Sequence, residues 1–246
     1  MNSFKERIRK LALQKSPLIL ANDYDDQKNL ESRTIKNIKT LSDSLCAIKF
    51  NFHLLLPFGE KQILNITKTA HSYGLQTIAD IKLNDIGNTN LVAAQTLWDL
   101  GFDCIIVNPM MGPGNLENLI KLSHQNKKGV ISLCHMSSPE AKVTYELGVK
   151  LGSKSTQLYK LFLQWATKMS ADGIIVGATF PSIIQYCKKQ SRGKLNVFSP
   201  GIGTQGGDIS STVSAGSDYL IVGRTILNSK DPQNTARQIA SLASKN

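Results

Sequence analysis

The chain has 246 residues, of which 41% are hydrophobic, 19% charged and 7% aromatic, a composition that excludes disordered, collagen-like and coiled-coil proteins. A formal net charge of +11 favours anionic partners, but the basic residues are scattered and no aromatic residues interleave with them, so we expect no nucleic-acid partner. The four cysteines are widely separated and predict neither a zinc site nor a disulfide framework.

The amino-terminal residues 1–15 form an amphipathic basic stretch that predicts a helix and carries no signal-peptide core. Nowhere does an apolar run approach the roughly eighteen residues that a membrane span needs. We therefore expect a soluble protein with no membrane partner and a cytoplasmic location.

Eight short apolar runs, rich in β-branched residues and bounded by turn formers, then recur as candidate strands. They begin at Leu18, Cys46, Thr77, Cys104, Val130, Gly173, Asn196 and Tyr219. Helical patterns lie between and after them at Lys28–Leu41, Glu60–Tyr73, Asn90–Leu100, Asn115–Gln125, Ser155–Met169, Ser182–Gln190, Ile209–Ala215 and Pro232–Ala243. Eight strand–helix units in about 230 residues predict the α/β class and a closed (β/α)8 TIM barrel rather than an open doubly wound sheet. No linker divides residues 1–246, so we expect a single domain.

Charged residues occur at the ends of the first three predicted strands. The first strand ends at Asp23, the second carries Lys49, and the third continues into Asp80, Lys82 and Asp85. Alternate residues of a strand share a face, which directs Lys49, Asp80 and Lys82 into the barrel. A structural salt-bridge layer is the alternative, but burying ions costs several kcal/mol. Because barrel enzymes work at the carboxyl ends of their strands, the pattern favours a catalytic cluster.

The last two predicted strands indicate an anion site. SPGIGTQGGD follows the seventh strand, and the eighth ends at Gly223 and Arg224. Glycines allow backbone N–H groups to turn toward an anion, and arginine adds a bidentate donor, so a phosphate ester is the expected substrate. GIGTQG also fits a dinucleotide-binding pattern, but that pattern belongs in the first turn of a doubly wound sheet.

Two weaker candidates involve a serine and the histidines. Ser137, in LCHMSSP, places a hydroxyl at the end of the fifth strand, while its neighbours lack the nucleophile elbow of a catalytic triad. His53, His71 and His124 show no metal-ligand spacing, so we expect no metal site.

Taken in order, LILAND, the Lys49 strand, DIKLNDIGNT, HMSSP, SPGIGTQGGD and IVGRTI resemble the orotidine 5′-monophosphate decarboxylase family over nearly the whole barrel. The resemblance implies that CO2 is released from orotidine 5′-monophosphate (OMP) to give UMP in de novo pyrimidine biosynthesis, without a metal, flavin or other cofactor. It implies that Lys82 is the proton donor, that Asp80 lies beside the substrate carboxylate, and that Lys49 and Asp85 complete an alternating charged array.

The resemblance also implies the contacts to this small-molecule substrate. They are Asp23 and Lys49 to the ribose, Ser137 to the pyrimidine, and Pro200, Gln205, Gly223 and Arg224 around the phosphate. It further implies a homodimer in which the segment with Asp85, Ile86 and Thr89 reaches into the neighbouring active site. The segment Asn108–Gly114 departs from the family pattern.

Two other functions stay open at this point. A magnesium-dependent decarboxylase resembling 3-keto-L-gulonate 6-phosphate decarboxylase shares the D-x-K-x-x-D strand. In that group an acidic residue replaces the lysine of the second strand, so Lys49 favours the nucleotide enzyme. A basic nucleic-acid-binding module is the alternative from a different class.

Overall fold

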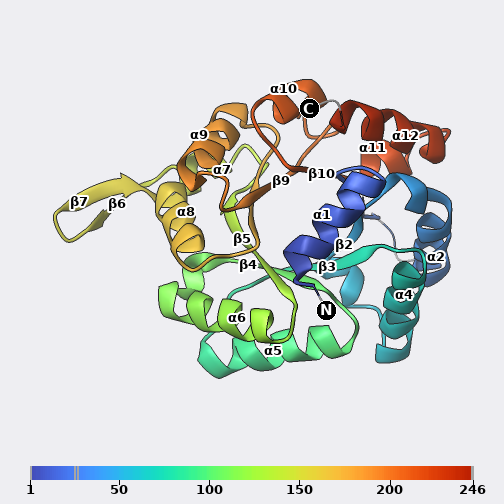
Figure 1. Ribbon diagram of the computed structural model, residues 1–246, viewed down its shortest axis with the longest axis horizontal. Coiled ribbons are helices and arrows are strands. Elements are labelled where there is room, and N and C mark those ends of the chain that lie inside the picture. The colour runs from blue at the N-terminus through green and yellow to red at the C-terminus, as the bar shows by residue number, and fades with distance from the viewer. Residues whose placement is uncertain (1, 25, 27, 245–246) are drawn as a thin grey trace.

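The computed structural model describes residues 2–24, 26 and 28–244. Eight parallel strands close into a barrel, with helices around its outside (Figure 1). These strands are β1 (Leu18–Asn22), β2 (Ala47–Asn51), β3 (Gln76–Leu83), β4 (Cys104–Val107), β5 (Gly129–His135), β8 (Gly173–Val176), β9 (Asn196–Pro200) and β10 (Tyr219–Val222). Around the barrel they follow the order β1, β10, β9, β8, β5, β4, β3, β2. The predicted (β/α)8 barrel is therefore confirmed.

The outer helices bury one face each against the strands. The longer ones are α2 (Leu30–Leu41), α4 (Glu60–Ser72), α5 (Gly87–Asp99), α6 (Pro113–Gln125), α8 (Leu158–Lys168), α9 (Pro181–Ser191) and α12 (Pro232–Ala243). Shorter ones are α3 (Phe52–Leu55), α7 (Ala141–Thr144), α10 (Ile209–Ser214) and α11 (Arg224–Leu227). Proline stands in the first turn of α6, α9 and α12, where its fixed φ suits a helix start and its missing N–H costs nothing. None of the described helices is long and apolar enough to cross a membrane.

Helix α1 (Phe4–Gln14) lies across the amino end of the barrel (Figure 1). Ser3 and Glu6 form a capping box at its start, and Phe4 and Ile8 are buried. The Phe4 ring packs so closely on Gly129 that a Cβ there would lie 2.3 Å from it. The helix falls inside the predicted stretch 1–15, of which Met1 lies outside the described residues.

One predicted helix is wrong at its start. The range Ser155–Met169 begins as strand β7 (Lys154–Gln157), which pairs antiparallel with β6 (Gly148–Leu151). The two strands form a hairpin that projects from the barrel (Figure 1). Gly152 turns the chain between them with φ +59°, a conformation that glycine adopts at little cost, and the helix starts only at Leu158.

Three aspartates tie the amino ends of neighbouring barrel strands together. Each precedes a strand, accepts a hydrogen bond from a backbone N–H of the adjacent strand at 2.8 or 2.9 Å, and pairs with a basic side chain of a helix. The three sets are Asp103 with the Thr77 amide and His71, Asp172 with the Val130 amide and His124, and Asp218 with the Val197 amide and Lys188. This end of the barrel therefore serves stability.

The Asp103 carboxylate gives a testable stability effect. Burial by itself raises the pKa of Asp103, but hydrogen bonds from His71 and Thr77 outweigh burial and hold the pKa below its usual value. A depressed pKa stabilises the fold above the unfolded-state pKa, and this contribution is lost as the pH falls through the folded-state pKa. We expect Asp103→Ala to lower the free energy of unfolding by about 3 kcal/mol near neutral pH.

Urea denaturation of the wild type and the variant at several pH values measures this effect. The difference should shrink as the pH falls through the lowered pKa of Asp103, where the wild-type carboxylate becomes protonated as well. Asp99→Ala, at an exposed position of α5, is the matched control and should change stability by less than about 0.5 kcal/mol. A difference between wild type and Asp103→Ala that stays constant with pH contradicts the assignment.

Candidate active site

Charged side chains of β2 and β3 meet at the carboxyl-end mouth of the barrel. The Nζ atom of Lys49 lies 2.7 Å from Oδ2 of Asp80, and the Nζ atom of Lys82 lies 2.8 Å from Oδ1. Lys49 also donates a hydrogen bond to the Asn51 side chain. Both oxygens of the Asp80 carboxylate are thus held by ammonium groups.

Burial distinguishes the members of this cluster. The side chains of Lys49 and Asp80 are 4% and 10% exposed, whereas that of Lys82 is 40% exposed. Burial by itself raises the pKa of Asp80, but the nearby ammonium groups of Lys49 and Lys82 outweigh it and keep the pKa below its usual value. Two ammonium groups around one ionised carboxylate leave the cluster with a net positive charge.

The backbone at Lys82 departs from a regular strand. Its φ is +47°, in the left-handed region that side-chain-bearing residues rarely adopt. The pairing of β3 with β4 shifts register between Ala79 and Leu83. The simple alternation predicted for Asp80 and Lys82 is therefore interrupted, although Lys82 still contacts Asp80. Strain of this kind persists where the surrounding structure enforces it, often at active sites.

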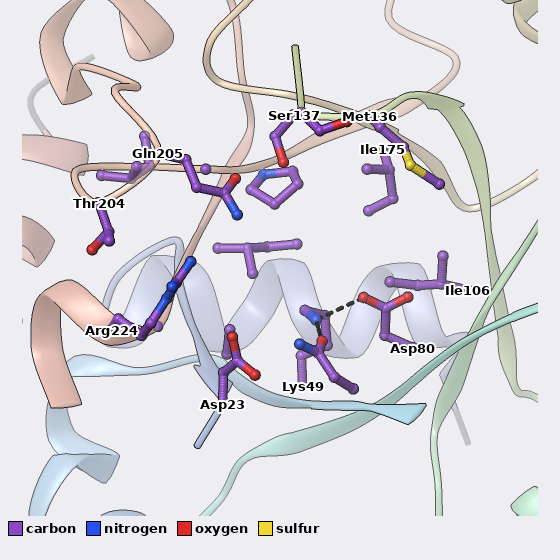
Figure 2. A pocket seen from close by; sticks show the side chains of 18 of the residues that line it. Asp23, Lys49, Asp80, Ile106, Met136, Ser137, Ile175, Thr204, Gln205 and Arg224 are labelled. Carbon is purple, nitrogen blue, oxygen red and sulfur yellow. Dashed lines mark hydrogen bonds and ion pairs between the residues drawn. The ribbon is translucent and has the colours of Figure 1, made fainter. Parts of the chain in front are cut away.

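A cleft of about 240 Å³ opens over this cluster. Its lining includes the predicted residues Asp23, Lys49, Asp80, Lys82, Ser137, Pro200, Gln205, Gly223 and Arg224. Figure 2 shows Thr204, Gln205 and Arg224 at one end of the cleft and the joined Lys49 and Asp80 at the other, with Asp23 and Ser137 on opposite sides. The cleft thus has a cationic end next to the glycine-rich loop and an ionic cluster at its far end.

The loop after β9 is closed on itself by backbone hydrogen bonds. The N–H groups of Gly203, Gly206 and Gly207 donate to carbonyl oxygens of the same loop at 2.7 to 2.9 Å. Gly203 has φ +72°, and a Cβ there would lie 2.4 Å from the Thr225 hydroxyl, so this position requires glycine. These three N–H groups are used within the loop, and the side chains of Gln205 and Arg224 face the cleft (Figure 2).

Three predicted site residues lie outside this cleft. Asp85 and Ile86 are exposed on the turn into α5, Thr89 is exposed in its first helical turn, and Ile86 is 74% exposed. The carboxylate of Asp85 accepts a hydrogen bond from the Ile86 amide at 2.7 Å, and the Asn90 side chain binds the Asp85 backbone. Within one chain, these residues do not contribute to the lining of the cleft.

Several lining residues were missed by the sequence reasoning. Asn51 could have been found, because it lies two residues after Lys49 and shares its strand face. Thr204 lay within the glycine-rich string. Gly201, also in that string, was among the glycines expected to face the anion. The remaining lining residues have no distinctive chemistry or adjoin predicted ones, and they are Ala21, Ile106, Leu133, Met136, Ser138, Ile175, Ile202 and Ile221. No residue of the Asn108–Gly114 segment is among the described residues that line this cleft.

Within the described part of the chain, the cysteines and the other potential metal ligands do not form a second functional site. Cys46, Cys104, Cys134 and Cys187 are buried and free. In residues 2–24, 26 and 28–244, histidine, cysteine, aspartate and glutamate side chains do not gather in threes as a metal ion requires.

A charged cleft at the carboxyl ends of eight parallel strands places this chain among the (β/α)8-barrel enzymes. Comparison with known proteins narrows that class. The model of the orotidine 5′-phosphate decarboxylase / HUMPS family matches residues 16–239. The chain belongs to this family, as the sequence resemblance predicted.

Named relatives agree with this assignment. The chain is 33% identical over 222 residues to orotidine 5′-phosphate decarboxylase of Pyrococcus abyssi, covering 90% of this chain and 96% of the relative. Identity to the enzyme of Thermococcus kodakarensis is 33% over 227 residues, covering 92% and 96%. The crystal structure of orotidine 5′-monophosphate decarboxylase from Methanocaldococcus jannaschii, complexed with inhibitor BMP, superposes with a TM-score of 0.78 at 28% identity. It covers 93% of this chain and 98% of that one.

Proposed function

We propose that this protein is a carboxy-lyase that converts OMP to UMP and CO2 in pyrimidine biosynthesis. The observation that carries the proposal is the Lys49–Asp80–Lys82 cluster, which lines the cleft of a chain from this family. The relative from Methanocaldococcus jannaschii, solved with inhibitor BMP, supports a small-molecule substrate in this cleft.

The proposed chemistry uses the charges of the cluster. When the bond from C6 to the carboxylate breaks, CO2 leaves and an electron pair stays at C6 with no adjacent carbonyl to accept it. Lys82 stabilises this charge and then gives its proton to C6, while Asp80 lies beside the substrate carboxylate. At an effective dielectric constant near 20, two unit charges about 4 Å apart interact by about 4 kcal/mol, so a few fixed charges change the barrier greatly. The proposal needs no metal, flavin or other cofactor.

The shape of the cleft supports one orientation of the nucleotide. The phosphate binds at the end formed by Pro200, Gln205, Gly223 and Arg224, and the pyrimidine lies toward the ionic cluster. Between them, Asp23 and Lys49 bind the ribose, and Ser137 contacts the base from the opposite side (Figure 2).

We also propose a homodimer with shared active sites. Asp85, Ile86 and Thr89 are exposed and lie off the cleft of their own chain, as residues that serve a neighbouring site would. In the dimer, Asp85 completes the Lys-Asp-Lys-Asp array next to the neighbour's Lys82. The proposal includes one domain for residues 1–246, of which 1, 25, 27, 245 and 246 lie outside the described residues, and a cytoplasmic location.

An absorbance assay of OMP consumption in chelator-treated buffer tests the proposed function. We expect full activity in the presence of EDTA. The magnesium-dependent sugar-phosphate decarboxylase would instead leave OMP unchanged and require added metal for its own substrate. Failure of the folded protein to consume OMP overturns the proposal.

Arg224→Ala tests the phosphate end of the cleft. Loss of a charge-assisted contact to the phosphate should lower kcat/KM for OMP by about a hundredfold or more. Initial rates with OMP and with the phosphate-free nucleoside orotidine measure the effect. The variant and the wild type should differ with OMP and agree with orotidine. An unchanged kcat/KM for OMP removes Arg224 from the site.

A further inference from the structure

Asp23 has a side-chain partner that lies outside the cleft lining. The Nε2 atom of His53, on α3, lies 3.2 Å from Oδ1 of Asp23 and 3.3 Å from the carbonyl oxygen of Tyr24. Of the described side chains, His53 alone comes within ion-pair distance of the Asp23 carboxylate. The side chain of His53 is 53% exposed, and that of Asp23 is 26% exposed.

The pairing of β1 with β2 brings these residues together. Asn22 is opposite Phe50 in the strand register, so Asp23 continues beside Asn51 at the barrel mouth. Helix α3 starts directly after β2 and returns His53 over the end of β1. The same strand thus directs Lys49 into the barrel and leads into the helix that carries His53 to the Asp23 carboxylate.

The contacts also fix which ring nitrogen carries hydrogen. A carbonyl oxygen and a carboxylate oxygen both accept hydrogen bonds and cannot donate them. Nε2 of His53 therefore carries a hydrogen, which it donates to the carbonyl oxygen of Tyr24, and this N–H group lies beside Oδ1 of Asp23. The positive end of this N–H dipole attracts one carboxylate oxygen of Asp23 and leaves the other available to a ligand.

The Asp23 carboxylate needs a fixed partner because cationic side chains lie on both sides of it. Figure 2 shows its carboxylate between Lys49 and Arg224, neither of which is within 4.0 Å. A carboxylate that could rotate freely would be drawn to one of these cations. It would then no longer point toward the ribose hydroxyls.

We propose that His53 is a positioning residue for nucleotide binding, which holds the Asp23 carboxylate toward the ribose. The inference rests on the proposed function, because that function assigns the ribose contact to Asp23. It adds a residue that itself does not touch the nucleotide.

The test compares UMP affinity, measured by calorimetry, with steady-state constants for OMP. His53→Ala should raise the Kd of UMP and the KM of OMP about tenfold, with kcat changed by less than about twofold, since only positioning is lost. His53→Gln should recover most of the affinity, because its amide N–H2 donates from a similar reach. Lys61→Ala, at an exposed position of α4, is the control and should leave both constants unchanged.

A double-mutant cycle separates positioning from a general structural role. In an Asp23→Ala background, His53→Ala should have no further effect on UMP affinity, because the group that it positions is gone. An equal loss in both backgrounds, or wild-type affinity in His53→Ala, overturns the inference. Binding of UMP needs no turnover, so a wild type that binds UMP without consuming OMP overturns only the proposed function. A wild type that binds no UMP overturns both.

Discussion

Replacement of Lys82 by alanine should lower kcat for OMP at least about a thousandfold while leaving UMP affinity within a few fold of wild type. The ammonium group of Lys82 is the most exposed member of the cluster and is bound to Asp80 alone among described side chains. Because Lys49 still holds the other oxygen of Asp80, the carboxylate should stay in place in the variant. The loss then reports on charge stabilisation and proton transfer rather than on a collapsed site.

Two further variants test this interpretation of Lys82. Lys82→Arg keeps a positive charge but donates a proton poorly, so kcat should stay far below wild type. Lys68→Ala, at an exposed position of α4, should have full activity. Calorimetric titration with UMP and single-turnover assays with OMP provide the measurements. If Lys82→Ala retains a tenth of the wild-type rate, Lys82 is not the proton donor.

The barrel and the location of the cluster could be predicted because both depend on local regularities. Apolar runs at regular spacing identified the strands, and the fold itself places strand ends at one mouth. The face shared by Asp80 and Lys82 followed from strand alternation, although the left-handed backbone at Lys82 interrupts that alternation. The strand pattern therefore placed the ammonium group of Lys82 near Asp80, but it did not predict the left-handed backbone at Lys82 that holds the group there.

Features that depend on backbone turns or on contacts in three dimensions, rather than on periodicity, could not be predicted in this way. The β6–β7 hairpin needs strand pairing across Gly152, which a helical pattern from Ser155 concealed. The loop after β9 uses its glycine N–H groups internally, and no sequence pattern separates that from an open anion site. His53 looked isolated in the sequence because its partner Asp23 is thirty residues away and meets it only through the β1–β2 register.

Asp85→Asn should inactivate the proposed homodimer nearly as fully as Lys82→Ala, although Asp85 lies outside the cleft of its own chain. In the proposed homodimer the Asp85 carboxylate completes the charge array beside the neighbour's Lys82, so its loss removes a fixed charge from the reacting centre. UMP should still bind, since the phosphate and ribose contacts are unchanged. A monomeric wild type in solution, measured by sedimentation, contradicts the shared site directly.

Subunit mixing distinguishes a shared site from one within a single chain. In a mixed dimer of Lys82→Ala and Asp85→Asn chains, one site carries both substitutions, and the other combines an intact Lys82 with an intact Asp85. Random exchange makes half of the dimers mixed, each with one active site, so about a quarter of the wild-type activity should return. Each variant alone, taken through the same exchange, is the control. A mixture no more active than these controls shows that Asp85 does not act across the interface.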